Sequence, residues 1–109
     1  MIFNIYIQLN PISKYYKEIS SLSEQLKVKN IYVFGSVLTP HFNQDSDVDF
    51  LINFHEDLTI EEYTDNYFIL HEKLSILLNR KIDLVTQRTL KNPYLIEKIN
   101  SSKELIYAN

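Results

Sequence analysis

The chain has 109 residues, 45% of them hydrophobic, with a formal net charge of −3 and no cysteine. This length is typical of one domain with its own hydrophobic core, and we expect a single domain over 1–109 with a core from about residue 12 to residue 99. The absence of cysteine excludes disulfides and thiolate ligands, and the scattered lysines and arginines argue against direct binding of a polymeric nucleic acid.

The first predicted elements are a strand, a helix and a second strand. Apolar and polar residues alternate from Phe3 to Leu9, as in a half-buried strand. After Pro11, apolar residues recur every three or four positions and predict a helix with one buried face, formed by Ile12, Tyr15, Tyr16, Ile19, Leu22 and Leu26. The apolar run from Ile31 to Phe34 predicts a central strand. It ends at Gly35, the only glycine, where we expect a positive φ or a close backbone approach.

A strand and a long helix are predicted next. The strand spans Val48 to Phe54, and the helix begins at a capping box formed by Thr59 and Glu62 and ends near Asn79. The buried stripe of this helix is predicted to contain Ile60, Tyr63, Tyr67, Leu70, Leu74 and Leu77.

The C-terminal part predicts one more strand and one more helix. The strand covers 82–86, and the helix runs from Asn92 or Pro93 to Ile99, since proline favours a first helical turn. The tail from Glu104 to Tyr107 fits either a final helical turn or a short strand.

The motif that points to chemistry is Gly35-Ser36, then ten residues, then Asp47-Val48-Asp49, with Asp83 on the third strand. Side chains two apart on a strand point the same way, so Asp47 and Asp49 share a face and repel unless a cation lies between them. Two Mg²⁺ ions about 3.5–4 Å apart suit such a carboxylate set. Asp83 would complete the ligands of the ion that activates the attacking hydroxyl.

The Gly-Ser turn predicts the place of a nucleotide triphosphate. Gly35 would let the chain approach the phosphates without a Cβ, and Ser36 would offer a hydroxyl and an N–H to them. Ser46, which precedes the acidic pair, is a third candidate for nucleotide binding. These parts together indicate metal-assisted nucleotidyl transfer.

The segments Phe34-Gly35-Ser36, Ser46-Asp47-Val48-Asp49-Phe50 and Lys81-Ile82-Asp83-Leu84-Val85 resemble the minimal nucleotidyltransferase (MNT) family of the DNA polymerase β superfamily. The resemblance covers roughly Ile12 to Ile99. It implies an α/β fold with a small mixed sheet and flanking helices, two Mg²⁺ ions, and ATP as substrate. It also implies that Asp47 and Asp49 bind both metals and that Asp83 binds the catalytic one.

One departure from the family concerns positive charge. Many relatives carry an arginine soon after Gly-Ser, whereas the stretch from Ser36 to Asp47 contains no lysine or arginine. Arg80, Lys81 and Arg88 are candidates for a phosphate-neutralising cation, and each is also readily explained as a solvated charge. His41 could touch a nucleotide or simply be exposed.

The resemblance further implies a partner. Small MNT proteins are commonly paired with a HEPN-domain RNase toxin, to which they transfer AMP on a tyrosine or which they hold in a complex. We expect an antitoxin that modifies its partner, because the chain devotes nearly all its length to the core and leaves no room for an acceptor domain. The alternatives are an antitoxin that acts by occlusion alone and an enzyme for a small molecule such as an aminoglycoside.

The aromatic residues give modest support for a partner. Eight tyrosines and six phenylalanines are many for this length, and tyrosine is enriched at interfaces. Tyr15, Tyr63 and Tyr67 fit core positions, whereas Phe42, Phe68 and Tyr94 are expected to be exposed. We expect a cytoplasmic protein without membrane contact, because the N-terminal residues lack signal-peptide features and no apolar run reaches the roughly 20 residues of a membrane helix.

Overall fold

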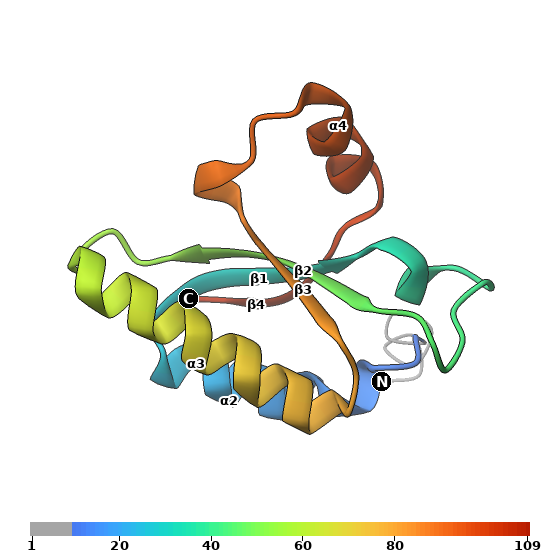
Figure 1. Ribbon diagram of the computed structural model, residues 1–109, viewed down its shortest axis with the longest axis horizontal. Helices are drawn as coiled ribbons and strands as arrows, with labels where there is room; N and C mark the ends of the chain where they lie inside the picture. The colour runs from blue at the N-terminus through green and yellow to red at the C-terminus, as the bar shows by residue number, and fades with distance from the viewer. Residues whose placement is uncertain (1–9) are drawn as a thin grey trace.

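A computed structural model describes residues 10–109, which form a four-stranded sheet with helices on both faces (Figure 1). The strands are β1 (Val28–Phe34), β2 (Val48–Phe54), β3 (Ile82–Thr86) and β4 (Glu104–Ala108), in the order β3-β2-β1-β4. Strand β1 is antiparallel to β2 and β4, whereas β2 and β3 are parallel. The predicted α/β fold with a mixed sheet is therefore confirmed. The strand predicted from Phe3 to Leu9 lies outside the described residues.

One face of the sheet is covered by α2 (Tyr16–Gln25) and α3 (Ile60–Leu78), which lie below the sheet in Figure 1. A short 3-10 helix, η1 (Ser13–Tyr15), precedes α2. The main hydrophobic core fills this interface, with fully buried side chains that include Ile19, Ile31, Val33, Val48, Phe50, Ile52, Leu70 and Leu74. The prediction for Ile60 is wrong: it occupies the first position of α3 and is 82% exposed. The core contact at this end of the helix is made instead by Tyr63, whose ring packs edge-on against Phe54 at 5.0 Å.

The opposite face is covered by α4 (Pro93–Ser102), which follows the 3-10 helix η3 (Gln87–Thr89). The buried side chain of Ile99 packs there against Phe34 and Leu51 in a second, smaller core. Asn92 caps α4, since its side chain accepts hydrogen bonds from the backbone N–H groups of Tyr94 and Leu95. The helix extends three residues beyond the predicted end at Ile99. In Figure 1 it lies above the sheet, on the side opposite α2 and α3.

The C-terminal tail is a strand. Strand β4 pairs antiparallel with β1, so the sheet extends beyond residue 99 and β1 is a central strand. The phenol of Tyr16 lies 3.1 Å from Glu104 Oε1 and joins α2 to this strand, and burial together with the Glu104 charge raises the pKa of Tyr16 to about 12. The local sequence pattern of the tail fits either a helical turn or a strand, and its long-range pairing with β1 decides for the strand.

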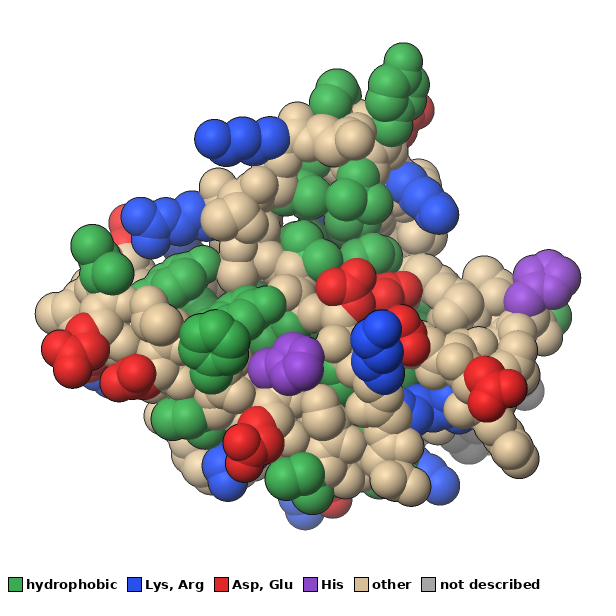
Figure 2. Space-filling model, viewed as in Figure 1, with side chains coloured by type: hydrophobic (Ala, Val, Ile, Leu, Met, Phe, Trp, Pro, Cys, Tyr) green, Lys and Arg blue, Asp and Glu red, His purple; other side chains and the backbone are tan. Residues whose placement is uncertain are grey.

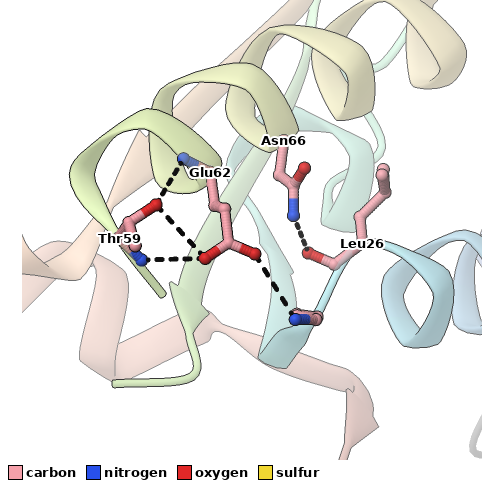
Figure 3. A network of polar contacts seen from close by, with 5 residues as sticks. Leu26, Thr59, Glu62 and Asn66 are labelled. Atoms are coloured by element: carbon pink, nitrogen blue, oxygen red, sulfur yellow. Dashed lines mark hydrogen bonds and ion pairs between the residues drawn. The ribbon is translucent and has the colours of Figure 1, made fainter. Parts of the chain in front are cut away.

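The start of α3 is fixed by the predicted capping box (Figure 3). The Thr59 hydroxyl accepts a hydrogen bond from the Glu62 N–H, and the Glu62 carboxylate accepts one from the Thr59 N–H, both at 3.1 Å. The hydrogen bonds that the Glu62 carboxylate accepts from the N–H and the hydroxyl of Thr59, followed by the charge of Lys27, lower the pKa of Glu62. Asn66 donates from its side chain to the carbonyl of Leu26 at 2.9 Å, which ties α3 to the end of α2. Asn79 ends the helix, as predicted, and adopts the left-handed conformation. Within residues 10–109, every helix is too short or too polar to cross a membrane.

Replacing Thr59 by Ala should lower the free energy of unfolding by about 1 kcal/mol, because the Glu62 N–H loses its capping partner, the Thr59 hydroxyl. Urea denaturation checks this. Thr64→Ala on the same helix is the matched control, since the Thr64 hydroxyl donates to the carbonyl of Ile60 one turn earlier and does not cap the end of the helix. Equal effects of the two substitutions would contradict the assignment of the cap.

Candidate active site

Two parallel strands bring the three predicted acids to one place. Asp49 on β2 and Asp83 on β3 are direct register partners, so their side chains leave the same face of the sheet on strands about 4.8 Å apart. Asp47 lies in the loop that enters β2, one residue before the strand begins. In Figure 2 acidic side chains gather near the centre of the view, below the segment that contains α4.

The carboxylates of this cluster repel one another, because the fold holds like charges close together. Partial burial, followed by the negative charges of Asp83 and Asp47, raises the pKa of Asp49 to about 6, while the positive charge of Lys98 acts in the opposite direction. Carboxylates forced together in this way share a cation or a proton at low energy. The cluster therefore attracts cations.

Gly35 is explained by its contact with Asp49. Its φ is +82°, and a Cβ placed on it would collide with the Asp49 carboxylate. Both expected reasons for a glycine are therefore present. The group that approaches the backbone is a carboxylate of the site itself, which lies under the Gly-Ser turn.

Ser36 and Ser46 lie at the two ends of the spacer loop. Ser36 belongs to a 3-10 helix, η2 (Gly35–Leu38), and its carbonyl accepts hydrogen bonds from the N–H and the hydroxyl of Thr39. The Ser46 hydroxyl accepts from the Asn43 N–H at 3.1 Å, which closes the turn before Asp47. Ser46 thus has a structural role in the loop, and its nucleotide-binding role stays a prediction.

Arg80 holds the spacer loop in place. Its Nη1 donates to the carbonyls of Asn43 and Ser46, each at 2.8 Å, and its guanidinium stacks over the ring of Phe42 at 4.2 Å. The expectation that Phe42 is exposed is therefore wrong, because the ring is half-buried against the core and under Arg80. Arg80 is committed to the loop and is a poor candidate for a phosphate cation.

Of the remaining cation candidates, Lys81 is exposed and Arg88 stacks over the ring of Tyr63 at 5.4 Å. His41 is exposed on the spacer loop. The lysine that acts on the acids is Lys98 of α4, which the sequence analysis missed. In the sequence, the only local indication of this placement would have been that Lys98 precedes Ile99, the buried residue that anchors α4.

The edge strand that carries Asp83 is secured by two side chains of α3. The Tyr67 hydroxyl donates to the carbonyl of Leu84 at 2.7 Å, and His71 Nε2 lies 2.9 Å from the carbonyl of Ile82. These carbonyls belong to the residues on either side of Asp83. The rise of one helical turn between Tyr67 and His71 matches the distance between Ile82 and Leu84, which are two residues apart on the strand. Helix α3 therefore fixes the position of Asp83, the third carboxylate.

The acidic cluster is partly exposed rather than enclosed: Asp83 is exposed, and Asp47 and Asp49 are half-buried. Among residues 10–109, no three acidic or histidine side chains converge closely enough to enclose a metal ion by themselves. A cleft of about 530 Å³ lies at the other end of β2, and none of the three acids is among its lining residues. The donor set nevertheless suits Mg²⁺, which binds through a few carboxylates and completes its octahedron with water and substrate phosphates.

A Gly-Ser turn over clustered carboxylates on neighbouring strands defines a nucleotidyltransferase. The family described as "Polymerase beta, Nucleotidyltransferase" matches residues 17–109, and the chain belongs to this family. A Methanocaldococcus jannaschii protein named as a candidate protein adenylyltransferase is 37% identical over 92% of this chain and 94% of its own length. The protein adenylyltransferase MntA of Thermococcus cleftensis is 37% identical over 65% of this chain and 68% of its own length.

Solved structures support the fold. A solved structure described as a candidate minimal nucleotidyltransferase is 27% identical, with a TM-score of 0.64 over 85% of this chain and 90% of that one. A toxin–antitoxin complex with AMP-PNP gives a TM-score of 0.67 at 22% identity, over 86% of this chain and 73% of that one. A Shewanella oneidensis complex of a tri-AMPylated HEPN toxin with an MNT antitoxin gives 0.62 at 20% identity, over 88% and 71% of the two chains.

Replacing Gly35 by Ala should destabilise the fold by at least about 1 kcal/mol from the positive φ alone, with a further loss from the clash with Asp49. A double-mutant cycle with Asp49→Ala separates the two effects, because removing the carboxylate should restore only the second part. Additive losses in thermal unfolding would show that the contact with Asp49 is unimportant.

Asp49 should make the metal-free protein less stable as the pH rises from about 4 to about 7. Its folded pKa of about 6 is above the ordinary value of 3.8, so the folded state binds the proton more tightly and loses that advantage as the pH passes 6. Asp49→Asn should flatten this pH dependence. At pH 7 it should stabilise the metal-free protein by on the order of 1 kcal/mol, since solvent screens part of the repulsion. Melting temperatures at pH 5 and pH 7 in EDTA provide the test, and an unchanged profile would contradict it.

Proposed function

We propose that this protein transfers AMP from ATP to a hydroxyl group of a partner protein and acts as the antitoxin of a HEPN-type toxin. The observation that carries the proposal is the carboxylate cluster under the Gly35 turn, in which Asp49 and Asp83 are register partners. The protein adenylyltransferases among its relatives support the reaction, and the HEPN–MNT complex among the fold neighbours supports the partner.

In this proposal the chain binds ATP at the Gly-Ser turn. Gly35 and Ser36 bring backbone close to the β- and γ-phosphates, and Ser46 orders the entry to the acidic pair. Two bound Mg²⁺ ions would neutralise the triphosphate and lower the pKa of the attacking hydroxyl. Asp47 and Asp49 would hold both ions, and Asp83 would hold the one on the acceptor side.

The proposed transfer is an in-line displacement at the α-phosphate. The acceptor oxygen, a tyrosine hydroxyl in the favoured case, forms a bond to the α-phosphorus while the bond to the bridging oxygen breaks and pyrophosphate leaves. The acceptor proton passes to solvent or to the Asp83 carboxylate. Lys98 lies close enough to Asp49 to lower its pKa, so we assign it the phosphate-neutralising role for which the spacer loop has no basic residue.

An antitoxin that acts by occlusion alone is the second candidate. The exposed large hydrophobic side chains on α3 and α4, including Ile60, Phe68 and Tyr94, favour stable binding to a partner. Occlusion does not require the acids, however, and their retention at register positions favours catalysis.

Asp47→Asn combined with Asp49→Asn should lower AMP transfer by at least about 100-fold, because the carboxylates that would hold the metals are lost. The assay follows label from α-labelled ATP with Mg²⁺ onto the HEPN-type partner protein. Asp57→Asn is the matched control, since Asp57 is an exposed acid in the loop before α3. Undiminished transfer by the double variant would overturn the assignment of the site. A wild-type protein that binds and inhibits the partner without transferring label would instead support occlusion.

A further inference from the structure

The strand order gives the site two distinct sides. Gly35 and Ser36 follow β1, whereas Asp83 lies on β3, and β2 with Asp49 stands between them. With the phosphates at the Gly-Ser turn, the leaving group lies on the β1 side. In an in-line displacement the attacking group arrives from the opposite direction. The acceptor therefore approaches across β3.

An apolar groove lies along this outer side of β3. It has a volume of about 470 Å³ and is lined by Tyr63, Thr64, Tyr67, Phe68, Leu84, Val85, Thr86 and Thr89. Val85 and Asp83 are two residues apart on one strand, so their side chains point to the same face about 7 Å from each other. A chain seated in the groove would pass beside the third carboxylate.

The groove is built to receive side chains rather than a strand. The outward carbonyls of Ile82 and Leu84 already accept hydrogen bonds from His71 and Tyr67, so an added strand would find them occupied. Phe68 stands at its rim with 65% of its surface exposed and contacts the Tyr67 ring edge-on at 5.3 Å. In Figure 2 hydrophobic side chains over α3 lie beside the acidic cluster.

We propose that this groove, between α3 and β3, docks the acceptor segment of the partner protein, a segment in which apolar side chains flank the hydroxyl that receives AMP. The inference rests on the proposed function, since it takes the acceptor side of the site from the direction of the displacement. The apolar lining selects apolar neighbours of the acceptor residue, and the acids nearby exclude an acidic segment through like-charge repulsion.

Phe68→Ser tests the groove by removing its exposed aromatic rim. Affinity for the full-length HEPN-type partner should fall at least ten-fold, and the KM for that partner should rise in AMP transfer, while the Kd for Mg-ATP stays unchanged. Ile76→Ser is the matched control on the same helix, because Ile76 is 71% exposed and lies outside this groove. Thr64→Arg is a second variant that fills the groove without removing an aromatic contact, and it should act like Phe68→Ser.

Each outcome of this experiment either supports or overturns the proposed docking groove. Loss of Mg-ATP affinity in the Phe68 and Thr64 variants would place the adenine base in the groove and overturn the proposal. Unchanged partner affinity in both variants, or no partner binding by the wild-type protein, would also overturn it. The wild-type protein could also bind the partner and transfer no AMP. In that case a selective loss of partner binding in both variants would support the docking groove and overturn only the proposed catalytic function.

Discussion

Repulsion between carboxylates at the ends of β2 and β3 is the constraint on which the rest of this structure depends. The register pairing of Asp49 with Asp83 cannot relax without breaking the sheet, and Gly35 leaves the room into which Asp49 fits. Burial, together with the charges of Asp83 and Asp47, raises the pKa of Asp49 to about 6. A site prepared in this way favours cations, because their binding removes the repulsion that the fold maintains.

One face of the sheet carries the main hydrophobic core, and the other face carries the acidic site. The face under α2 and α3 carries the main core, and the two buried polar side chains among residues 10–109 are both hydrogen-bonded. The Ser23 hydroxyl donates to the carbonyl of Ile19, and the Thr86 hydroxyl pairs with that of Thr89 at 2.7 Å. The other face is only partly covered by α4, whose anchor is Ile99 against Leu51. Partial cover leaves the acids accessible to a nucleotide and brings Lys98 to them. The helix that completes the small core thus also sets the charge balance of the site.

Helix α3 links both faces. Its buried residues belong to the main core, whereas Tyr67 and His71 reach around the edge of the sheet to the carbonyls that flank Asp83. These bonds protect an edge strand from pairing with another chain and leave an apolar groove beside it. The same arrangement therefore orders a proposed metal ligand and shapes the surface proposed for the acceptor.

The local pattern determined much of this protein. The period-2 and period-3.6 spacings located β2, β3 and α3 closely, and the Gly-Ser turn with its acids indicated the chemistry, because these features depend on neighbours in the chain. From the sequence alone we could not predict that Ile60 lies outside the core, that Phe42 is half-buried under Arg80, or that residues 104–108 form a strand. Those outcomes, together with Lys98 beside Asp49 and the pairing of Asp49 with Asp83, were decided by tertiary structure, since each depends on contacts between segments far apart in the chain.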